Sequence, residues 1–82
     1  MRVLIIEDDV QLHIAISEFF KIKTFATVSV KDGLQAIDQI DNEQFDLYII
    51  DINIPNISGQ ELLKHIRKTY IDTPVIIITD SS

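Results

Sequence analysis

The feature that most constrains the fold of this chain is an apolar run over residues 47–50 that ends at Asp51. Beyond Asp51 the run gives way to turn-forming residues, among them Pro55 and Gly59. A continuous apolar run, without alternation, predicts a strand that is buried on both faces. Asp51 is then the first residue to reach water, at the carboxyl end of the strand, where open α/β sheets bind ligands. We therefore expect Asp51 to be the reactive group of the chain.

Three more segments have the pattern of strands. Residues 3–6 and 75–78 are continuous apolar runs, and residues 25–30 alternate and are rich in β-branched side chains. Each interval between these strands has apolar residues at helical spacing, which predicts one helix in each. The order β-α-β-α-β-α-β implies right-handed crossovers and a parallel sheet covered on both faces, an α/β fold.

The expected helices also carry recognisable starts and buried faces. Asp8 or Asp9 can cap the first helix, because a short acidic side chain accepts hydrogen bonds from the free amides of the first turn. Ser58 can cap the third, with Glu61 three residues later as in a capping box. The buried stripe of the first helix is expected to contain Leu12, Ala15, Ile16, Phe19 and Phe20.

Composition narrows the class of protein. The chain has 82 residues, which suits one small domain, and no cysteine, which excludes a disulfide framework and a thiolate zinc site. Its net charge of −6 and scattered basic residues argue against direct nucleic-acid binding. No apolar run approaches the roughly 20 residues that span a bilayer, and the start does not resemble a signal peptide. We expect a soluble, cytoplasmic protein without membrane contact.

Polar residues follow three of the expected strands. Glu7 and Asp8 follow the first strand, Asp51 ends the third and Thr79 follows the fourth. Parallel strands bring these groups to one edge of the sheet, and if the first and third strands are neighbours where the order reverses, the crevice between their ends holds three carboxylates. Two carboxylates about 4 Å apart repel by roughly 4 kcal/mol at an effective dielectric of about 20, so such a cluster must protonate or bind a cation. Oxygen ligands without histidine or cysteine favour Mg²⁺, Mn²⁺ or Ca²⁺, and few ligands with open positions favour Mg²⁺.

A carboxylate nucleophile beside Mg²⁺ indicates phosphoryl chemistry. Asp51 would attack phosphorus to give an aspartyl phosphate, while the metal neutralises the phosphoryl oxygens. Thr79 is placed so that its hydroxyl can hydrogen-bond the incoming group. Each acid taken alone is better explained as a helix cap or a surface residue, but three acids and a threonine at three strand ends favour a site.

With these residues in place, the sequence resembles the receiver domain of bacterial two-component response regulators. The resemblance is carried by three segments, of which the middle one is the most specific: VLIIEDD, DLYIIDINIPNISG and VIIITD. It implies a flavodoxin-like, doubly wound parallel sheet with strand order 2-1-3-4 in this chain. It also implies that residues 1–82 form a receiver domain that is incomplete at the C-terminus, because a full one continues through a fifth strand.

The resemblance implies a role for each matching residue. Asp51 matches the phospho-accepting aspartate, and Thr79 the hydroxyl residue that bonds the phosphoryl group. Asp8 matches the main acidic Mg²⁺ ligand, and Glu7 its partner, which usually acts through water. Asn53 would give its backbone carbonyl to the metal, beside the Asp51 carboxylate. The implied function is Mg²⁺-dependent acceptance of a phosphoryl group from a sensor histidine kinase, which controls an output domain. Such a domain is a signalling module, catalysing at most its own phosphorylation and dephosphorylation.

The chain departs from the family at its end. The lysine at the end of strand 5 that pairs with the phosphoryl group in the family has no equivalent here, which puts the activity of the isolated chain in doubt. The strand at residues 75–78 would also be left with an unpaired apolar edge, and such edges recruit other strands. We therefore expect self-association through this edge.

Two other functions compete with the phospho-acceptor. A haloacid-dehalogenase-like phosphatase also has an aspartate nucleophile after an apolar strand. The nucleophile motif of that family is similar to Asp-x-Asp, however, whereas position 53 here is asparagine. An interaction module that keeps the fold without the reaction is the other alternative. The missing lysine favours it, and the three intact acids argue against it.

Overall fold

The computed structural model describes residues 1–79, and Asp80, Ser81 and Ser82, which close the expected domain range, lie outside the described residues. Strands and helices alternate along the chain as expected. The elements are β1 (Arg2–Ile6), α1 (Val10–Ile22), β2 (Ala26–Val30), α2 (Gly33–Asn42), β3 (Leu47–Asp51), α3 (Gly59–Thr69) and β4 (Val75–Ile78).

All strands of the sheet are parallel, in the order β2-β1-β3-β4. This confirms the order 2-1-3-4. The register places Ile5 of β1 opposite Ile49 of β3, and Ile49 opposite Ile76 of β4. The chain therefore reverses its direction of travel across the sheet between β1 and β3, and the carboxyl ends of these two neighbours lie side by side. This is the switch point at which doubly wound sheets bind ligands.

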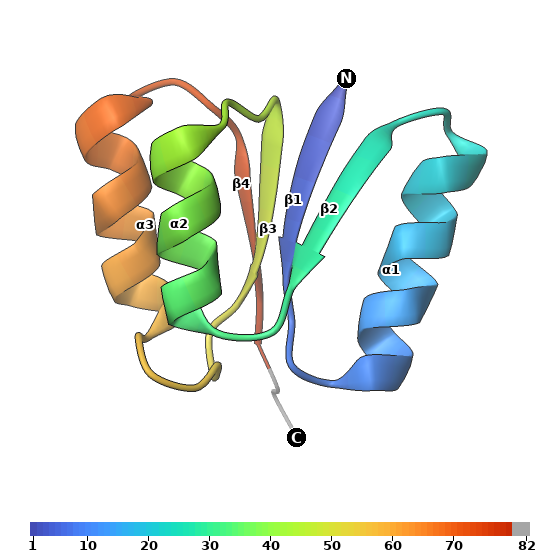
Figure 1. Cartoon of the computed structure of the whole chain (residues 1–82), viewed down its shortest axis with the longest axis horizontal. Coiled ribbons are helices and arrows are strands. Elements are labelled where there is room, and N and C mark those ends of the chain that lie inside the picture. The colour runs from blue at the N-terminus through green and yellow to red at the C-terminus, as the bar shows by residue number, and fades with distance from the viewer. Residues whose placement is uncertain (80–82) are drawn as a thin grey trace.

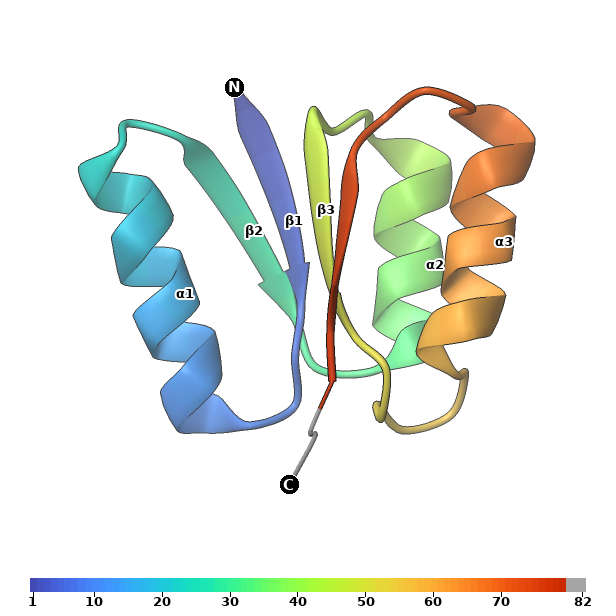
Figure 2. The same ribbon diagram turned by 180° about the vertical axis from the view of Figure 1, so that it is seen from behind.

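The sheet is covered on both faces, with α1 on one side and α2 and α3 on the other (Figures 1 and 2). The β1 and β3 side chains divide between two cores accordingly. Leu4, Tyr48 and Ile50 pack in the core under α2 and α3, while Val3, Ile5 and Ile49 pack in the core under α1. This two-sided burial is why the strands are apolar without alternation. Within residues 1–79, no helix is long and apolar enough to cross a membrane.

Each helix begins at a side chain that accepts hydrogen bonds from its first turn. Asp9, and not Asp8, caps α1 by accepting from the Gln11 and Leu12 amides at 3.0 and 3.2 Å. Asp32 caps α2, and Ser58 Oγ caps α3 by accepting from the Glu61 amide at 3.2 Å. With Asp9 engaged as a cap, Asp8 is left for another role.

The expected buried stripe of α1 is only partly correct. Phe20 and Ile16 pack against the core under α1, but Ala15 is exposed, and Phe19 and Leu12 are 55% and 38% exposed. The reason is that α1 packs on β1 and β2, so one side of its apolar stripe extends past these strands toward β4. We call the resulting apolar hollow the α1–β4 groove, and its lining residues are Ala15, Ile16, Phe19, Phe20, Ile49, Ile76 and Ile78.

Candidate functional site

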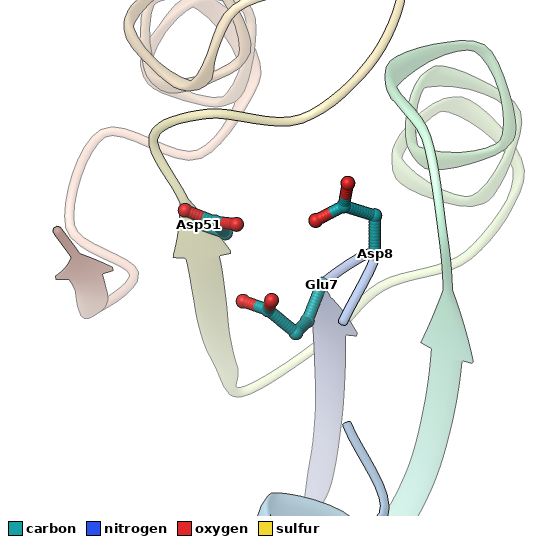
Figure 3. A group of neighbouring side chains, drawn as sticks. All are labelled: Glu7, Asp8 and Asp51. Carbon is teal, nitrogen blue, oxygen red and sulfur yellow. The ribbon is translucent and has the colours of Figure 1, made fainter. Parts of the chain in front are cut away.

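The carboxylates of Glu7, Asp8 and Asp51 meet at the carboxyl edge of the sheet. β1 ends at Ile6, so Glu7 and Asp8 follow it directly, and Asp51 is the last residue of β3. Figure 3 shows the three side chains pointing toward one another across the gap between these two strand ends. One oxygen from each lies within 4.8 Å of the others. The sequence therefore predicted correctly that these three acids come together.

Glu7 is the buried member of this group. Glu7 is only 2% exposed, and its Oε1 accepts a hydrogen bond from the Asp9 amide at 3.1 Å. The other oxygen, Oε2, is buried and has no hydrogen-bond partner among the described residues. Burial raises the pKa of Glu7 from 4.5 to about 7, the nearby Asp51 and Asp8 carboxylates add to this, and the Asp9 amide opposes it. A buried oxygen without a donor is costly, and it is a place where a cation fits.

Asp51 and Asp8 are more accessible than Glu7. Asp51 is half-buried, and its Oδ1 accepts a hydrogen bond from the Asn53 amide at 3.1 Å, which fixes the carboxylate relative to the β3–α3 loop. Asp8 is exposed. The three acids therefore differ in exposure: Glu7 is buried, Asp51 is half-buried and Asp8 is exposed. A ligand that arrives from solvent reaches Asp51 before it reaches Glu7.

An open cavity of about 400 Å³ lies over this group. Its lining contains every residue that the sequence assigned to the site: Glu7, Asp8, Asp51, Asn53 and Thr79. Ile78, Leu12 and Asp9 complete it. None of these three was predicted as a site residue, although Leu12 and Asp9 lie at the start of α1, which directly follows Asp8. No lysine or arginine from residues 1–79 lines the cavity, so its charged groups are all acidic.

The donor set fits a small, hard divalent cation. It consists of carboxylate oxygens, Asn53 also lines the cavity, and the set contains no histidine or thiolate. The unpaired Glu7 Oε2 is a second observation that favours a cation here, because a bound cation would interact with a buried oxygen that has no hydrogen-bond donor. Glu7, Asp8 and Asp51 are the residues that would hold such an ion.

The sequence matches the response regulator receiver domain family over residues 3–82. It is 33% identical to the cell cycle response regulator CtrA of Brucella ovis over 79 residues, which are 96% of this chain and 34% of CtrA. The chain thus spans about a third of the length of the curated relatives that it matches.

The fold matches solved structures of receiver domains. The receiver domain of the Francisella response regulator 1452 has a TM-score of 0.89 and 33% identity, and the match covers 99% of this chain and 67% of that one. TrrA of Thermotoga maritima in complex with Mg²⁺ and BeF has a TM-score of 0.90 and 28% identity, covering 99% and 70%. A second structure holds TrrA in complex with the histidine kinase ThkA, and its TM-score is 0.87.

Proposed function

The chain belongs to the response regulator receiver domain family, and we propose that it accepts a phosphoryl group on Asp51 in the presence of Mg²⁺. One observation carries the proposal: the clustered oxygens of Glu7, Asp8 and Asp51 at the β1 and β3 ends, one of them buried and unpaired. Membership of this family also favours a receiver over the phosphatase alternative. Mg²⁺ held by these carboxylates and the Asn53 carbonyl would supply positive charge against the phosphoryl oxygens.

In the proposed reaction, an Asp51 carboxylate oxygen attacks phosphorus of a phosphohistidine. The new O–P bond forms as the P–N bond breaks, the electron pair passes to the imidazole nitrogen, and that nitrogen takes up a proton. The Asn53 amide holds one Asp51 oxygen in place at 3.1 Å, which leaves the other for attack. The exposed Thr79 hydroxyl would donate a hydrogen bond to the transferred group from the end of β4.

A phosphoramidate assay tests this proposal, because phosphoramidate contains the P–N bond of phosphohistidine without a kinase. We expect the chain with Mg²⁺ to gain the mass of one phosphoryl group, and the gain to disappear with EDTA or in Asp51→Asn. Asp38→Asn, the same change on the exposed face of α2, should retain the gain.

Beryllofluoride provides an independent measurement, since it mimics a phosphoryl group on a competent aspartate. With Mg²⁺ it should shift the amide resonances of residues 51–53 in the wild type and leave those of Asp51→Asn unchanged. If neither the mass nor the resonances change in the wild type, Asp51 is not a phospho-acceptor in this chain, and the interaction-module alternative is favoured.

We propose a sensor histidine kinase as the phosphoryl donor and an output domain as the controlled partner. The support is by similarity: TrrA has been solved with the histidine kinase ThkA, and CtrA is about three times as long as the matched segment. A purified histidine kinase, autophosphorylated with labelled ATP, should lose its label to the wild type and not to Asp51→Asn. Retention of the label by every kinase tested, with phosphoramidate transfer intact, would point to another donor.

We also propose that the 82-residue chain self-associates through β4. Within residues 1–79, β4 pairs only with β3, and at the two ends of this ladder the Tyr48 and Ile52 amides donate to the Pro74 and Ile78 carbonyls at 3.1 and 3.0 Å. In a parallel ladder alternate residues face the partner, so the backbone groups of Val75 and Ile77 point away from β3. β4 carries no charged side chain, so two copies can pair about a twofold axis without repulsion there.

Sedimentation of two matched variants tests this pairing. Ile77→Lys places a charge on the free edge, where Ile77 is 37% exposed, and should convert the dimer into a monomer. Leu34→Lys makes a similar change at a 62% exposed position on α2 and should leave the dimer intact. A monomeric wild type at all concentrations would contradict self-association.

A further inference from the structure

The start of α2 contacts the loop that follows the proposed phospho-acceptor. The β3–α3 loop, residues 52–58, begins beside Asp51 and ends at the cap of α3. The Gly33 amide donates a hydrogen bond to the Pro55 carbonyl at 3.0 Å. Gly33 is the first residue of α2, which precedes β3 in the sequence. Figure 1 shows the β2–α2 connection running beside the loop.

The contact leaves no room for a side chain on Gly33. A Cβ at this position would overlap the Ile57 Cβ and lie 2.9 Å from the Ile57 nitrogen and 3.0 Å from its Cα. Two of these three are atoms of the loop backbone, which cannot rotate out of the way. Gly33 does not have a positive φ, so the position demands glycine for space and not for conformation.

The loop itself is held tightly at the same point. The Pro55 carbonyl also accepts from the Ile57 amide at 3.0 Å, and Asn56 between them has a φ of 76°. Ile54 is 9% exposed in the core under α2 and α3, and Ile57 packs against that core. A turn anchored in this way moves as a unit when one of its residues is displaced.

The first residues of this loop, next to Asp51, contact the site. The Asn53 amide donates to Asp51 Oδ1 at 3.1 Å, and Asn53 lines the acidic cavity. Asn53 lies two residues before Pro55, whose carbonyl accepts from Gly33. A displacement of the turn at Ile57 is therefore passed to the group that orients the Asp51 carboxylate.

We propose that Gly33 is a positioning residue for the Asp51 site, because its lack of a side chain lets the β3–α3 loop lie where the Asn53 amide can hold the Asp51 carboxylate. Mg²⁺ demands near-ideal octahedral geometry, so a shift of a few tenths of an ångström in the loop weakens binding. This inference rests on the proposed Mg²⁺ site. It adds that a residue outside the acidic cavity, on a different element, determines the affinity of that site.

Calorimetric titration of the chain with Mg²⁺ tests the inference. Gly33→Ala should weaken Mg²⁺ binding by about 10-fold or more, the size of effect seen when residues that orient metal ligands are changed. Leu34→Gly is the matched control: it weakens α2 at the neighbouring, exposed position without touching the loop, and should alter the dissociation constant less than about 2-fold. Urea denaturation of both variants separates loss of binding from loss of folding.

Nuclear magnetic resonance of the wild type gives a second measurement that does not depend on the folding of Gly33→Ala. The Gly33 amide resonance should shift during Mg²⁺ titration with the same dissociation constant as the site residues, because its acceptor is on the loop. The Gln39 amide, on the same helix, should not. If the wild type binds Mg²⁺ but the Gly33 resonance does not move, or if folded Gly33→Ala binds with unchanged affinity, the positioning role is wrong and the proposed function stands. A wild type that does not bind Mg²⁺ overturns both.

Discussion

Replacing Glu7 by glutamine should change how the stability of the metal-free chain depends on pH. Glu7 is 2% exposed, and burial raises its pKa from 4.5 to about 7. Glutamine has nearly the same shape, does not ionise, and can keep an acceptor for the Asp9 amide. Its amide nitrogen would take the place of an oxygen and could donate to Asp51. The substitution thus removes the titration while it preserves the packing.

The sign follows from the direction of the pKa change. The pKa of Glu7 is higher in the folded state than in the unfolded state, so between pH 4.5 and about 7 the folded chain holds a proton that the unfolded chain has released. The free energy of unfolding of the wild type therefore falls as pH rises through this window. A tenfold change in an ionisation constant is worth about 1.4 kcal/mol, so the total loss from Glu7 is about 3 kcal/mol.

Urea denaturation in EDTA, followed by circular dichroism from pH 4.5 to 8.5, measures this effect. The stability of Glu7→Gln relative to the wild type should rise by about 3 kcal/mol across the range. Glu18→Gln, the same change on the exposed side of α1, should keep the wild-type slope because it leaves Glu7 in place. Asp51→Asn should retain most of the slope, since burial is the largest cause of the raised pKa of Glu7. A difference between Glu7→Gln and wild type that does not vary with pH would refute the reasoning.

Three further substitutions test the scaffold, each by urea denaturation at pH 7 in EDTA. Leu62→Ala should cost about 2–5 kcal/mol because Leu62 is completely buried, and a loss below about 1 kcal/mol would mean that the core is loosely packed. Asp9→Ala should cost about 1 kcal/mol because the Asp9 carboxylate accepts from two amides of α1, and Asp9→Asn should recover most of that loss. Arg67→Ala should cost about 1–3 kcal/mol because the guanidinium donates to two carbonyls of the α3–β4 turn, at 3.1 and 2.6 Å. Equal losses in Arg67→Ala and the exposed Lys68→Ala would contradict that anchoring role.

β1 and β3 could be predicted from the sequence because burial on both faces leaves uninterrupted apolar runs at residues 3–6 and 47–50. Residues 75–78 are apolar in the same way and form β4, although Ile76 and Ile77 are 49% and 37% exposed. The order of those strands could not be predicted in this way, since buried strands resemble one another, and the family resemblance supplied it. The burial of Phe19 was wrong for a related reason: periodicity shows which side of α1 is apolar but not how much sheet lies beneath it.

The site was predictable as far as strand ends determine it. Glu7, Asp8 and Asp51 meet because parallel strands end at the same edge and because β1 and β3 are neighbours, which the strand pattern alone did not predict. Two of its properties depend on how separate elements pack. Glu7 Oε2 is buried without a hydrogen-bond partner among the described residues, and the contact of Gly33 with the loop joins segments that are distant in the sequence. Such contacts leave no periodic pattern.

The cost of ionising Glu7 and the proposed Mg²⁺ site have the same cause, which is the burial of the Glu7 carboxylate. The same burial that makes ionised Glu7 unfavourable also keeps water from its Oε2, so a cation at this oxygen relieves a cost of about 3 kcal/mol at alkaline pH. Cation binding selects the ionised carboxylate, and it must release a proton wherever the pH lies below about 7. In saturating Mg²⁺ Glu7 is ionised in both the folded and the unfolded chain above pH 4.5, so the decline in stability between pH 4.5 and 7 should disappear. A carboxylate buried only as packing, with no cation to receive, would show the same decline with and without Mg²⁺.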